Sequence, residues 1–288
     1  MQYQGICQKM KASLSEQNPH QSQNNSNVQY HFVLNDDVVE QQIQLGQPLH
    51  IHWTGKIHCV KCGAKTSKSF AQGYCFRCFK NAAECDLCIM KPETCHYDAG
   101  TCRDNEFALS TCFQPHIVYL ANSSGLKVGI TRVQNQPSRW LDQGAMQALP
   151  ILSVGSRRLS GQLESLLATE LADKTDWRKL LKGDAETLDL LQLRDDVLQQ
   201  FAQAITHIRQ QYAQHIEFNE QIEELKQEIQ TFRYPILQYP DKIKSHNLDK
   251  TPDISGVLHG IKGQYLILDT GVINLRKYTG YELALSFD

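Results

Sequence analysis

Cys59-Val-Lys-Cys62-Gly63 and Cys75-Phe-Arg-Cys78 are the two stretches that decide how the middle of this chain folds. Each holds two cysteines separated by two residues, and twelve residues lie between the pairs. Two thiolates on a tight turn can grip one ion, and a second pair completes the tetrahedron that zinc accepts. Gly63 eases the first turn, because glycine adopts positive φ without strain. The spacing predicts a closed, structural zinc site of zinc-ribbon type with Cys59, Cys62, Cys75 and Cys78 as ligands; an iron–sulfur cluster and redox dithiols are the alternatives.

A second group of candidate ligands follows along the chain. Cys85-Asp-Leu-Cys88 forms a half site, and two further ligands would complete a second tetrahedral zinc site. The set that we expect is Cys85, Cys88, Cys102 and Cys112. Cys95 and His96 compete for the last two positions. We therefore expect two structural zinc ions in all.

Composition is typical of a globular protein and gives a first indication of the compartment. The 288 residues are 41% hydrophobic and 21% charged, and no apolar run is long enough to cross a bilayer. The N-terminal stretch lacks the apolar core of a signal peptide. We therefore expect a cytoplasmic protein with no membrane partner. In a reducing compartment clustered cysteines bind metal more often than they form disulfides, and a secreted disulfide framework is the alternative.

Charge is segregated along the chain although the formal net charge is only −2. Residues 56–91 hold seven Lys or Arg against two Asp or Glu, whereas residues 184–231 hold three against ten. A basic front half could present a positive field to a nucleic acid. Alternatively, the lysines near the cysteines only offset the charge of thiolate-bound zinc.

Hydrophobic patterns predict an α+β protein of several parts. Apolar and polar residues alternate at 30–34 and 49–53, which is typical of strands. An apolar stripe with steps of three and four residues from Val197 to Ile216 indicates a helix, and Ile222, Leu225 and Ile229 continue the stripe. Residues 256–275 have the pattern of a β-meander. We expect the last strands to pack with the first ones. The expected divisions are 1–57 (N-terminal strands with a mobile loop at 13–27), 58–115 (double zinc module), 116–182 (α/β unit), 183–232 (helical arm) and 233–288 (C-terminal β-meander).

The segment from His116 to Lys182 is the part that looks like an active site. Residues 116–120 and 126–131 should pair as a hairpin, and Ser138 is a plausible N-cap for a following helix. A third strand is expected at 148–154, and a further helix starts near Ser160.

This order of elements resembles the GIY-YIG endonuclease superfamily. In the resemblance, Tyr119 falls on the tyrosine of the first motif and Gly129 on the glycine of the second. Arg139 matches the arginine of the first helix, and Glu164 matches the single metal-binding carboxylate. The second motif's tyrosine is replaced by Lys127, which could bind phosphate or act as a base if burial lowers its pKa.

The resemblance implies hydrolysis of a phosphodiester. Glu164 would hold Mg²⁺ or Mn²⁺ against the phosphate, Arg139 would stabilise developing negative charge, and Tyr119, with Lys127, would handle water or phosphate. Further phosphate contacts are expected from Arg132, Lys174 and Arg178. The alternative is a non-catalytic zinc module that binds nucleic acid, a protein or a ribonucleoprotein such as a ribosome or tRNA complex.

The whole chain also resembles an uncharacterised bacterial zinc-binding family (domain of unknown function 2797). The likeness rests on the stretch from Cys62 to Cys75, on Tyr119-Leu-Ala-Asn-Ser-Ser-Gly-Leu-Lys-Val-Gly-Ile-Thr-Arg132 and on Gly260-Ile-Lys-Gly-Gln-Tyr265. It implies a cytoplasmic zinc protein and brings no established activity with it.

Overall fold

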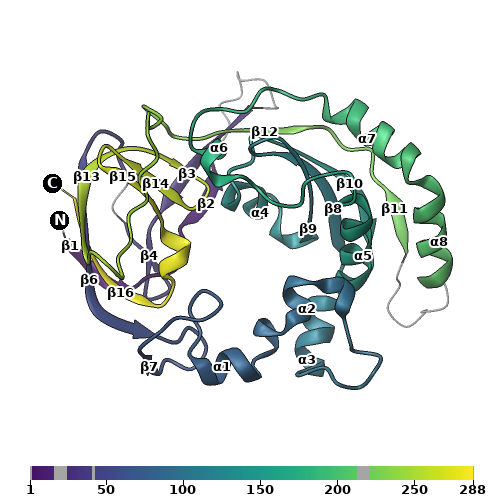
Figure 1. Cartoon of the computed structure of the whole chain (residues 1–288), viewed down its shortest axis with the longest axis horizontal. Helices are drawn as coiled ribbons and strands as arrows, with labels where there is room; N and C mark the ends of the chain where they lie inside the picture. The colour runs from purple at the N-terminus through teal and green to yellow at the C-terminus, as the bar shows by residue number, and fades with distance from the viewer. Residues whose placement is uncertain (1, 16–24, 41–42, 213–220, 288) are drawn as a thin grey trace.

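The computed structural model describes residues 2–15, 25–40, 43–212 and 221–287. Over these residues the chain is a mixed α/β protein in which two seven-stranded sheets face a shared core (Figure 1). None of the helices in the described ranges is long and apolar enough to cross a membrane. The cysteine-rich segment joins the two sheets along one edge of the molecule.

The first sheet brings the two ends of the sequence together. Its strand order is β1-β16-β6-β13-β14-β15, with β7 also paired to β6. The strands are β1 (Gln2–Ile6), β6 (Pro48–His58), β7 (Lys65–Thr66), β13 (Asp253–Lys262), β14 (Tyr265–Leu268), β15 (Gly271–Asn274) and β16 (Tyr281–Phe287). Since β16 lies between β1 and β6, the expectation that the last strands pack with the first ones is confirmed.

The second sheet carries the segment that looked like an active site. Its order is β2-β3-β12-β10-β8-β9, with β11 also paired to β10. The strands are β2 (Lys11–Leu14), β3 (Asn25–His31), β8 (His116–Asn122), β9 (Leu126–Arg132), β10 (Gln147–Val154), β11 (Ile222–Glu224) and β12 (Gln230–Arg233). The short strands β4 (Val33–Leu34) and β5 (Asp37–Val38) pair apart from both sheets. The expected hairpin is the antiparallel pair β8–β9, and every residue of β8 is buried.

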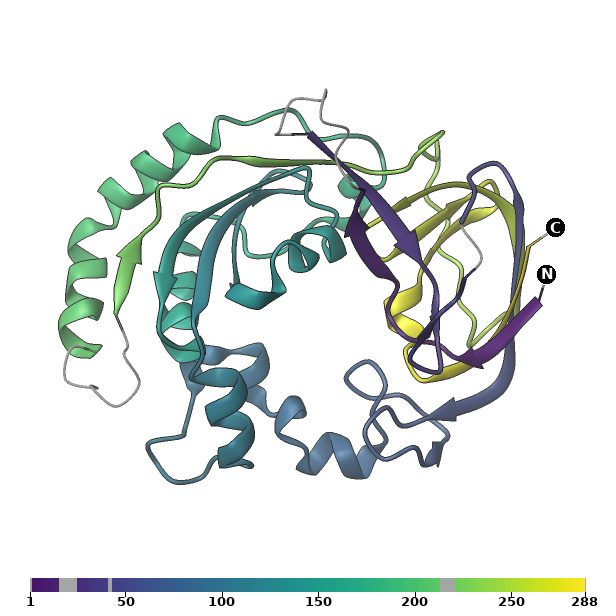
Figure 2. The same ribbon diagram turned by 180° about the vertical axis from the view of Figure 1, so that it is seen from behind.

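Helices cover both faces of the second sheet. α4 (Ser138–Asp142) places Trp140 and Leu141 in the core shared with the first sheet. On the other face, α5 (Arg157–Leu167) packs Leu159, Leu163 and Leu167 against the strands, in one apolar cluster with residues of α7 (Leu190–Gln200) and α8 (Ala202–Tyr212). Figure 2 shows that α7 and α8 follow the outer side of this sheet, away from the first sheet. α6 (Trp177–Leu180) lies between α5 and α7 in the sequence.

Short helical turns build the cysteine-rich segment. They are α1 (Phe76–Asn81), η1 (Ala83–Cys85), α2 (Leu87–Met90), η2 (Pro92–Thr94), α3 (Asn105–Phe107) and the π-helical turn η3 (Ala108–Cys112). The segment packs tightly on α5 through Gly161, where an added Cβ would come within 2.5 Å of the Cβ atom of Pro92. Small cores of this kind depend on such contacts, because they bury little apolar surface.

Three details of the expected elements are wrong. The helical arm does not run to Ile229, because Ile222 lies in β11, where its segment pairs with the otherwise open edge of β10. α4 has Pro137 at its N-cap position, and Ser138 is its first residue. α5 begins at Arg157 after Ser156, whose hydroxyl accepts a hydrogen bond from the N–H of Leu159, so the helix starts before Ser160. Of the loop expected at 13–27, residues 13–14 and 25–27 lie in β2 and β3, and 16–24 lie outside the described residues; Ile216 does so too.

Candidate active site and candidate metal centre

Four cysteines converge where the first sheet meets the cysteine-rich segment. The sulfur atoms of Cys59, Cys62, Cys75 and Cys78 all lie within 4.8 Å of one another. The sulfur of Cys62 is 3.9 Å from that of Cys75, and zinc–sulfur bonds of about 2.3 Å in a tetrahedron set sulfur atoms about 3.8 Å apart. Cys75 also caps α1, since its sulfur accepts from the N–H of Cys78. This tetra-cysteine cluster could bind a metal ion such as zinc.

The acidities of these thiols fit a cation at their centre. Burial would raise the pKa of Cys59, but hydrogen bonds from three backbone N–H groups outweigh it and hold the pKa at about 6. At Cys78, loss of hydration and then the three neighbouring sulfurs raise the pKa to about 12. A cation at the centre of the cluster would relieve the repulsion that raises the pKa of Cys78.

The remaining cysteines do not gather as expected. Cys85, Cys88, Cys102 and Cys112 form no such close group within the described residues. The thiol of Cys85 has its pKa raised by burial and by Glu84, and the cysteine that acts on it is Cys59 of the first cluster. Cys85 ends η1 and Cys88 belongs to α2, with the extended residue Asp86 between them.

The thiol of Cys88 is affected by the charges of three other cysteines. Burial raises its pKa first, followed by the charges of Asp86, Cys95, Cys112 and Cys102. A small cavity is lined by Cys88, Cys95 and Cys112 together with Arg157 and Arg158 of α5. Cys88, Cys95 and Cys112 thus line one cavity, but in the described residues neither these thiols nor the expected set place their sulfur atoms within 4.8 Å of one another.

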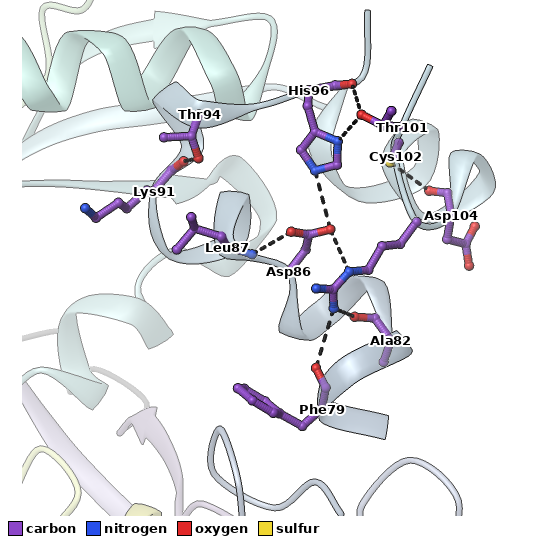
Figure 3. A network of polar contacts seen from close by, with 11 residues as sticks. Phe79, Ala82, Asp86, Leu87, Lys91, Thr94, His96, Thr101, Cys102 and Asp104 are labelled. Carbon is purple, nitrogen blue, oxygen red and sulfur yellow. Dashed lines mark hydrogen bonds and ion pairs between the residues drawn. The ribbon is translucent and has the colours of Figure 1, made fainter. Parts of the chain in front are cut away.

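Asp86, Cys88 and His96 also place their ligand atoms within 4.8 Å of one another, and Nε2 of His96 lies 3.4 Å from the carboxylate of Asp86 (Figure 3). The carboxylate of Asp86 accepts from the N–H of Leu87 at 2.6 Å and pairs with Nε of Arg103 at 2.9 Å. Nδ1 of His96 lies 2.8 Å from the hydroxyl of Thr101. Asp86 is therefore satisfied by a cation that the chain itself supplies.

Arg103 joins the two cysteine groups. Besides Asp86, its guanidinium donates to the carbonyl oxygens of Ala82 at 3.1 Å and Phe79 at 3.5 Å, at the end of α1. α1 contains Cys78 of the first cluster and has Cys75 of the same cluster as its N-cap, and Arg103 follows Cys102 directly. One side chain thus fixes the position of the second group relative to the first.

On the second sheet, the hairpin β8–β9 places Tyr119 opposite Gly129. The side chain of Tyr119 is fully buried, and a Cβ atom on Gly129 would lie 2.6 Å from both Cζ and the hydroxyl oxygen of its ring. The glycine is therefore a spatial requirement for the tyrosine. Two residues earlier on β9, Lys127 is 3% exposed and enters the same region.

Gln143 ties Tyr119 and Lys127 together. Its side-chain oxygen accepts from the Tyr119 hydroxyl at 3.1 Å and from the Lys127 ammonium at 2.5 Å. Two donors on one amide oxygen fix the orientation of the amide and leave its NH₂ group as a donor for another partner. Gln143 caps the end of α4, one turn after Arg139.

Glu164 and Arg139 complete this group of charges. Burial raises the pKa of Glu164 to about 7, although Arg139, Arg157 and Lys127 oppose the rise, and Asp173 adds to it. Burial lowers the pKa of Lys127 to about 8, helped by Arg139. No ion pair joins Glu164 to Arg139 in the part of the chain that the structure describes, so their charges act on each other without direct contact.

The structure thus brings Tyr119, Lys127, Arg139 and Glu164 together from β8, β9, α4 and α5. It adds residues that the sequence did not single out. Gln143 could have been found from its place one turn after Arg139, and Arg157 from its place two turns before Glu164. Asp173 lies beside Lys127 because the chain after α5 runs along the edge of β9, where the N–H of Val128 donates to the carbonyl of Ala172 at 2.8 Å. No sequence pattern near Asp173 or Lys127 predicts that contact.

The three basic residues expected at phosphate differ in their surroundings. Arg132 ends β9, and its charge acts on Arg157 and His116. Lys174 is exposed in the stretch after α5. The guanidinium of Arg178 stacks 4.5 Å from the centre of the Trp177 ring.

Fold and sites together define a mixed α/β protein with a tetra-cysteine cluster that could bind a metal ion and a separate, partly buried group of opposite charges. Residues 46–283 match the family described as "Protein of unknown function (DUF2797)", and the chain belongs to this family. No curated protein and no solved structure matches the chain.

Proposed function

We propose that this chain is a metal-dependent nuclease of GIY-YIG type that hydrolyses phosphodiester bonds in DNA or structured RNA. The observation that carries the proposal is the convergence of Tyr119, Lys127, Arg139 and Glu164 from four separate elements on one group of interacting charges. Packing alone does not call for a partly buried carboxylate close to two arginines and a buried lysine, because removing such charges from water is costly.

Each side chain has a role that follows from its surroundings. Arg139, unpaired with Glu164, can stabilise negative charge that develops on a phosphate. The Tyr119 hydroxyl is too deeply buried to meet solvent, so it orients Gln143, whose NH₂ group can then donate to a phosphate oxygen. The Lys127 ammonium donates to the same amide oxygen of Gln143 and adds positive charge beside it.

Glu164 would hold a divalent cation such as Mg²⁺ or Mn²⁺. The carboxylates of Glu164 and Asp173 act on each other electrostatically, and one or two carboxylates plus water suit Mg²⁺. When bound, such an ion would polarise a phosphodiester oxygen.

The cysteine groups would brace this site rather than take part in it. We assign a structural zinc ion to Cys59, Cys62, Cys75 and Cys78, and a second ion to Cys88, Cys95, Cys102 and Cys112. Arg157 supports this role, because it donates to the carbonyl of Ile89 in α2 at 2.6 Å and also acts on Glu164. Zinc content should fall by about one ion per chain in Cys95→Ser and stay unchanged in Cys85→Ser; the reverse would restore the set expected from the sequence.

Cleavage of a labelled panel of single-stranded, double-stranded and stem-loop DNA and RNA with Mg²⁺ or Mn²⁺ tests the nuclease. Glu164→Gln should lower the rate at least about 100-fold, since it removes the metal-binding charge and keeps the shape. Glu170→Gln, an exposed residue just past α5, is the matched control and should cleave like the wild type. Equal rates in wild type and Glu164→Gln would overturn the role given to Glu164.

The second candidate is a non-catalytic zinc module that binds nucleic acid or a ribonucleoprotein. It is favoured by Lys127, which stands where the superfamily has tyrosine and is buried on Gln143. Salt-dependent binding by the wild type without cleavage of any substrate in the panel would select this function.

A further inference from the structure

A polar cavity of about 410 Å³ opens beside the first cysteine cluster, outside the group of residues described above. One wall is the loop between Cys62 and Cys75, with Lys68 and Gln72, and the other comes from the 3-10 turn η6 (Leu275–Tyr278), with Arg276 and Lys277. The volume falls in the range of small-molecule sites.

The wall of this cavity carries an excess of positive charge. Lys68, Arg276 and Lys277 face one carboxylate, that of Asp249. This carboxylate already accepts from the Tyr281 hydroxyl at 2.7 Å. Within the described residues, no ion pair joins Asp249 or any other carboxylate to these three cations. Three cations around one cavity attract an anion of more than one negative charge.

The cations are held in place by the surrounding structure. Nε of Arg276 donates to the side-chain oxygen of Gln72 at 2.7 Å, which ties η6 to the loop. Gly73 brings the loop close to η6, since a Cβ atom there would lie 3.2 Å from the Thr279 side chain. The loop is anchored at both ends by cysteines of the first cluster, so the metal that these cysteines could bind would also hold one wall of the cavity.

Arg276 lies within electrostatic reach of Arg139 in the candidate active site. Burial lowers the pKa of its guanidinium, and repulsion from Arg139 lowers it further. Two cations from different elements that repel each other are a favourable place for the successive negative charges of a nucleic-acid backbone. Asp142, which also acts on Arg276, already pairs with Lys9 and accepts from Gln264, so it does not neutralise the arginines.

We propose that this cavity binds the phosphate of a nucleotide next to the one at the candidate active site, so that one strand spans both places. The inference rests on the proposed function for the second of these places. It makes the substrate a single strand, or the single-stranded part of a structured nucleic acid, because a cavity of about 410 Å³ has room for one nucleotide rather than for a duplex. Gln72 and Asn274 on the wall supply amide groups that can meet the sugar or base.

The test measures binding rather than cleavage. Fluorescein-labelled single-stranded DNA and RNA dodecamers are titrated with the full chain carrying Glu164→Gln, and anisotropy is followed at several salt concentrations. Adding Lys68→Gln and Lys277→Gln should weaken binding about tenfold and reduce the slope of log Kd against log salt by about 1.4, which is two phosphate contacts to a single strand. Both lysines are exposed, so we expect the variant to keep the fold. Thermal unfolding of the variant and its parent checks this expectation.

The control carries Lys11→Gln and Lys226→Gln, two exposed lysines outside the cavity, and should bind like its parent. Equal affinity of the cavity variant and its parent would overturn the proposal. So would inorganic phosphate or adenosine monophosphate binding as tightly as the strand in a lysine-dependent way, since the ligand would then be a free small molecule. Lysine-dependent strand binding by a chain that cleaves nothing would refute the nuclease and leave this binding site standing.

Discussion

Replacing Gly129 by alanine tests the central claim about the site, that β9 makes room for the buried ring of Tyr119. The added Cβ atom would lie 2.6 Å from both Cζ and the hydroxyl oxygen of Tyr119 and 3.0 Å from its Cε2. The ring cannot retreat, because Tyr119 is 0% exposed and packs edge-on against Trp140, itself fully buried.

Overpacking of this kind costs about 1–3 kcal/mol. For a chain of this size we expect a fall in Tm of roughly 2–10 °C, measured by calorimetry or circular dichroism. A ring that shifts also loses its hydrogen bond to Gln143, so cleavage by Gly129→Ala should fall in proportion to that of Tyr119→Phe.

Gly183→Ala is the matched control, because nothing lies within 4 Å of a Cβ atom there and the backbone needs no positive φ. It should leave Tm unchanged within about 1 °C. Combining Gly129→Ala with Tyr119→Ala should cost less than the two single changes added together, since the clash disappears with the ring. Full additivity, or a Gly129→Ala variant as stable as the wild type, would refute the reasoning.

Three more predictions follow from the sites. Folding raises the pKa of Glu164, so the folded chain keeps the proton to higher pH and loses stability as pH rises from about 4.5 to about 7. In urea unfolding without added divalent ions, the stability of Glu164→Gln relative to the wild type should therefore rise by up to about 3 kcal/mol between pH 5 and pH 8. A difference that stays constant with pH would contradict the raised pKa. Cys62→Ser should lower the zinc content of the purified chain by about one ion, whereas Cys7→Ser, a lone buried thiol, should leave it unchanged; zinc retained in Cys62→Ser would exclude that ligand. Gly161→Ala should destabilise the chain by about 1–3 kcal/mol and slow cleavage, because the added Cβ would clash with Pro92 and the backbone of Glu93. Lowered stability with normal cleavage would show that the packing of α5 on the cysteine-rich segment is not needed for catalysis.

The features that could be predicted from the sequence are those fixed over short distances along the chain. The first cysteine cluster follows from two turns of four residues, and the β8–β9 hairpin follows from two apolar runs around Asn122-Ser-Ser-Gly125. Both depend on neighbours within about twenty residues.

The features that could not be predicted depend on contacts between distant segments. Ile222 continued a helical period, but the open edge of β10 draws its segment into the second sheet. Cys85 and Cys88 share a two-residue spacing with the first cluster, yet an extended residue between two helical turns separates them. Arg276 approaches Arg139 only because the first sheet closes against the second, and no pattern around residue 276 marks it.

The position of β16 also determines when the first sheet can be completed during synthesis. Residues 281–287 form the strand between β1 and β6, so the first sheet stays split until these residues have left the ribosome. The cysteine segment and the β8–β9 hairpin emerge earlier and close over short stretches, which favours their folding first. A nascent chain paused before residue 281 would thus hold a loaded metal site beside an open, aggregation-prone pair of edges at β1 and β6, and early metal binding would protect only one side of it.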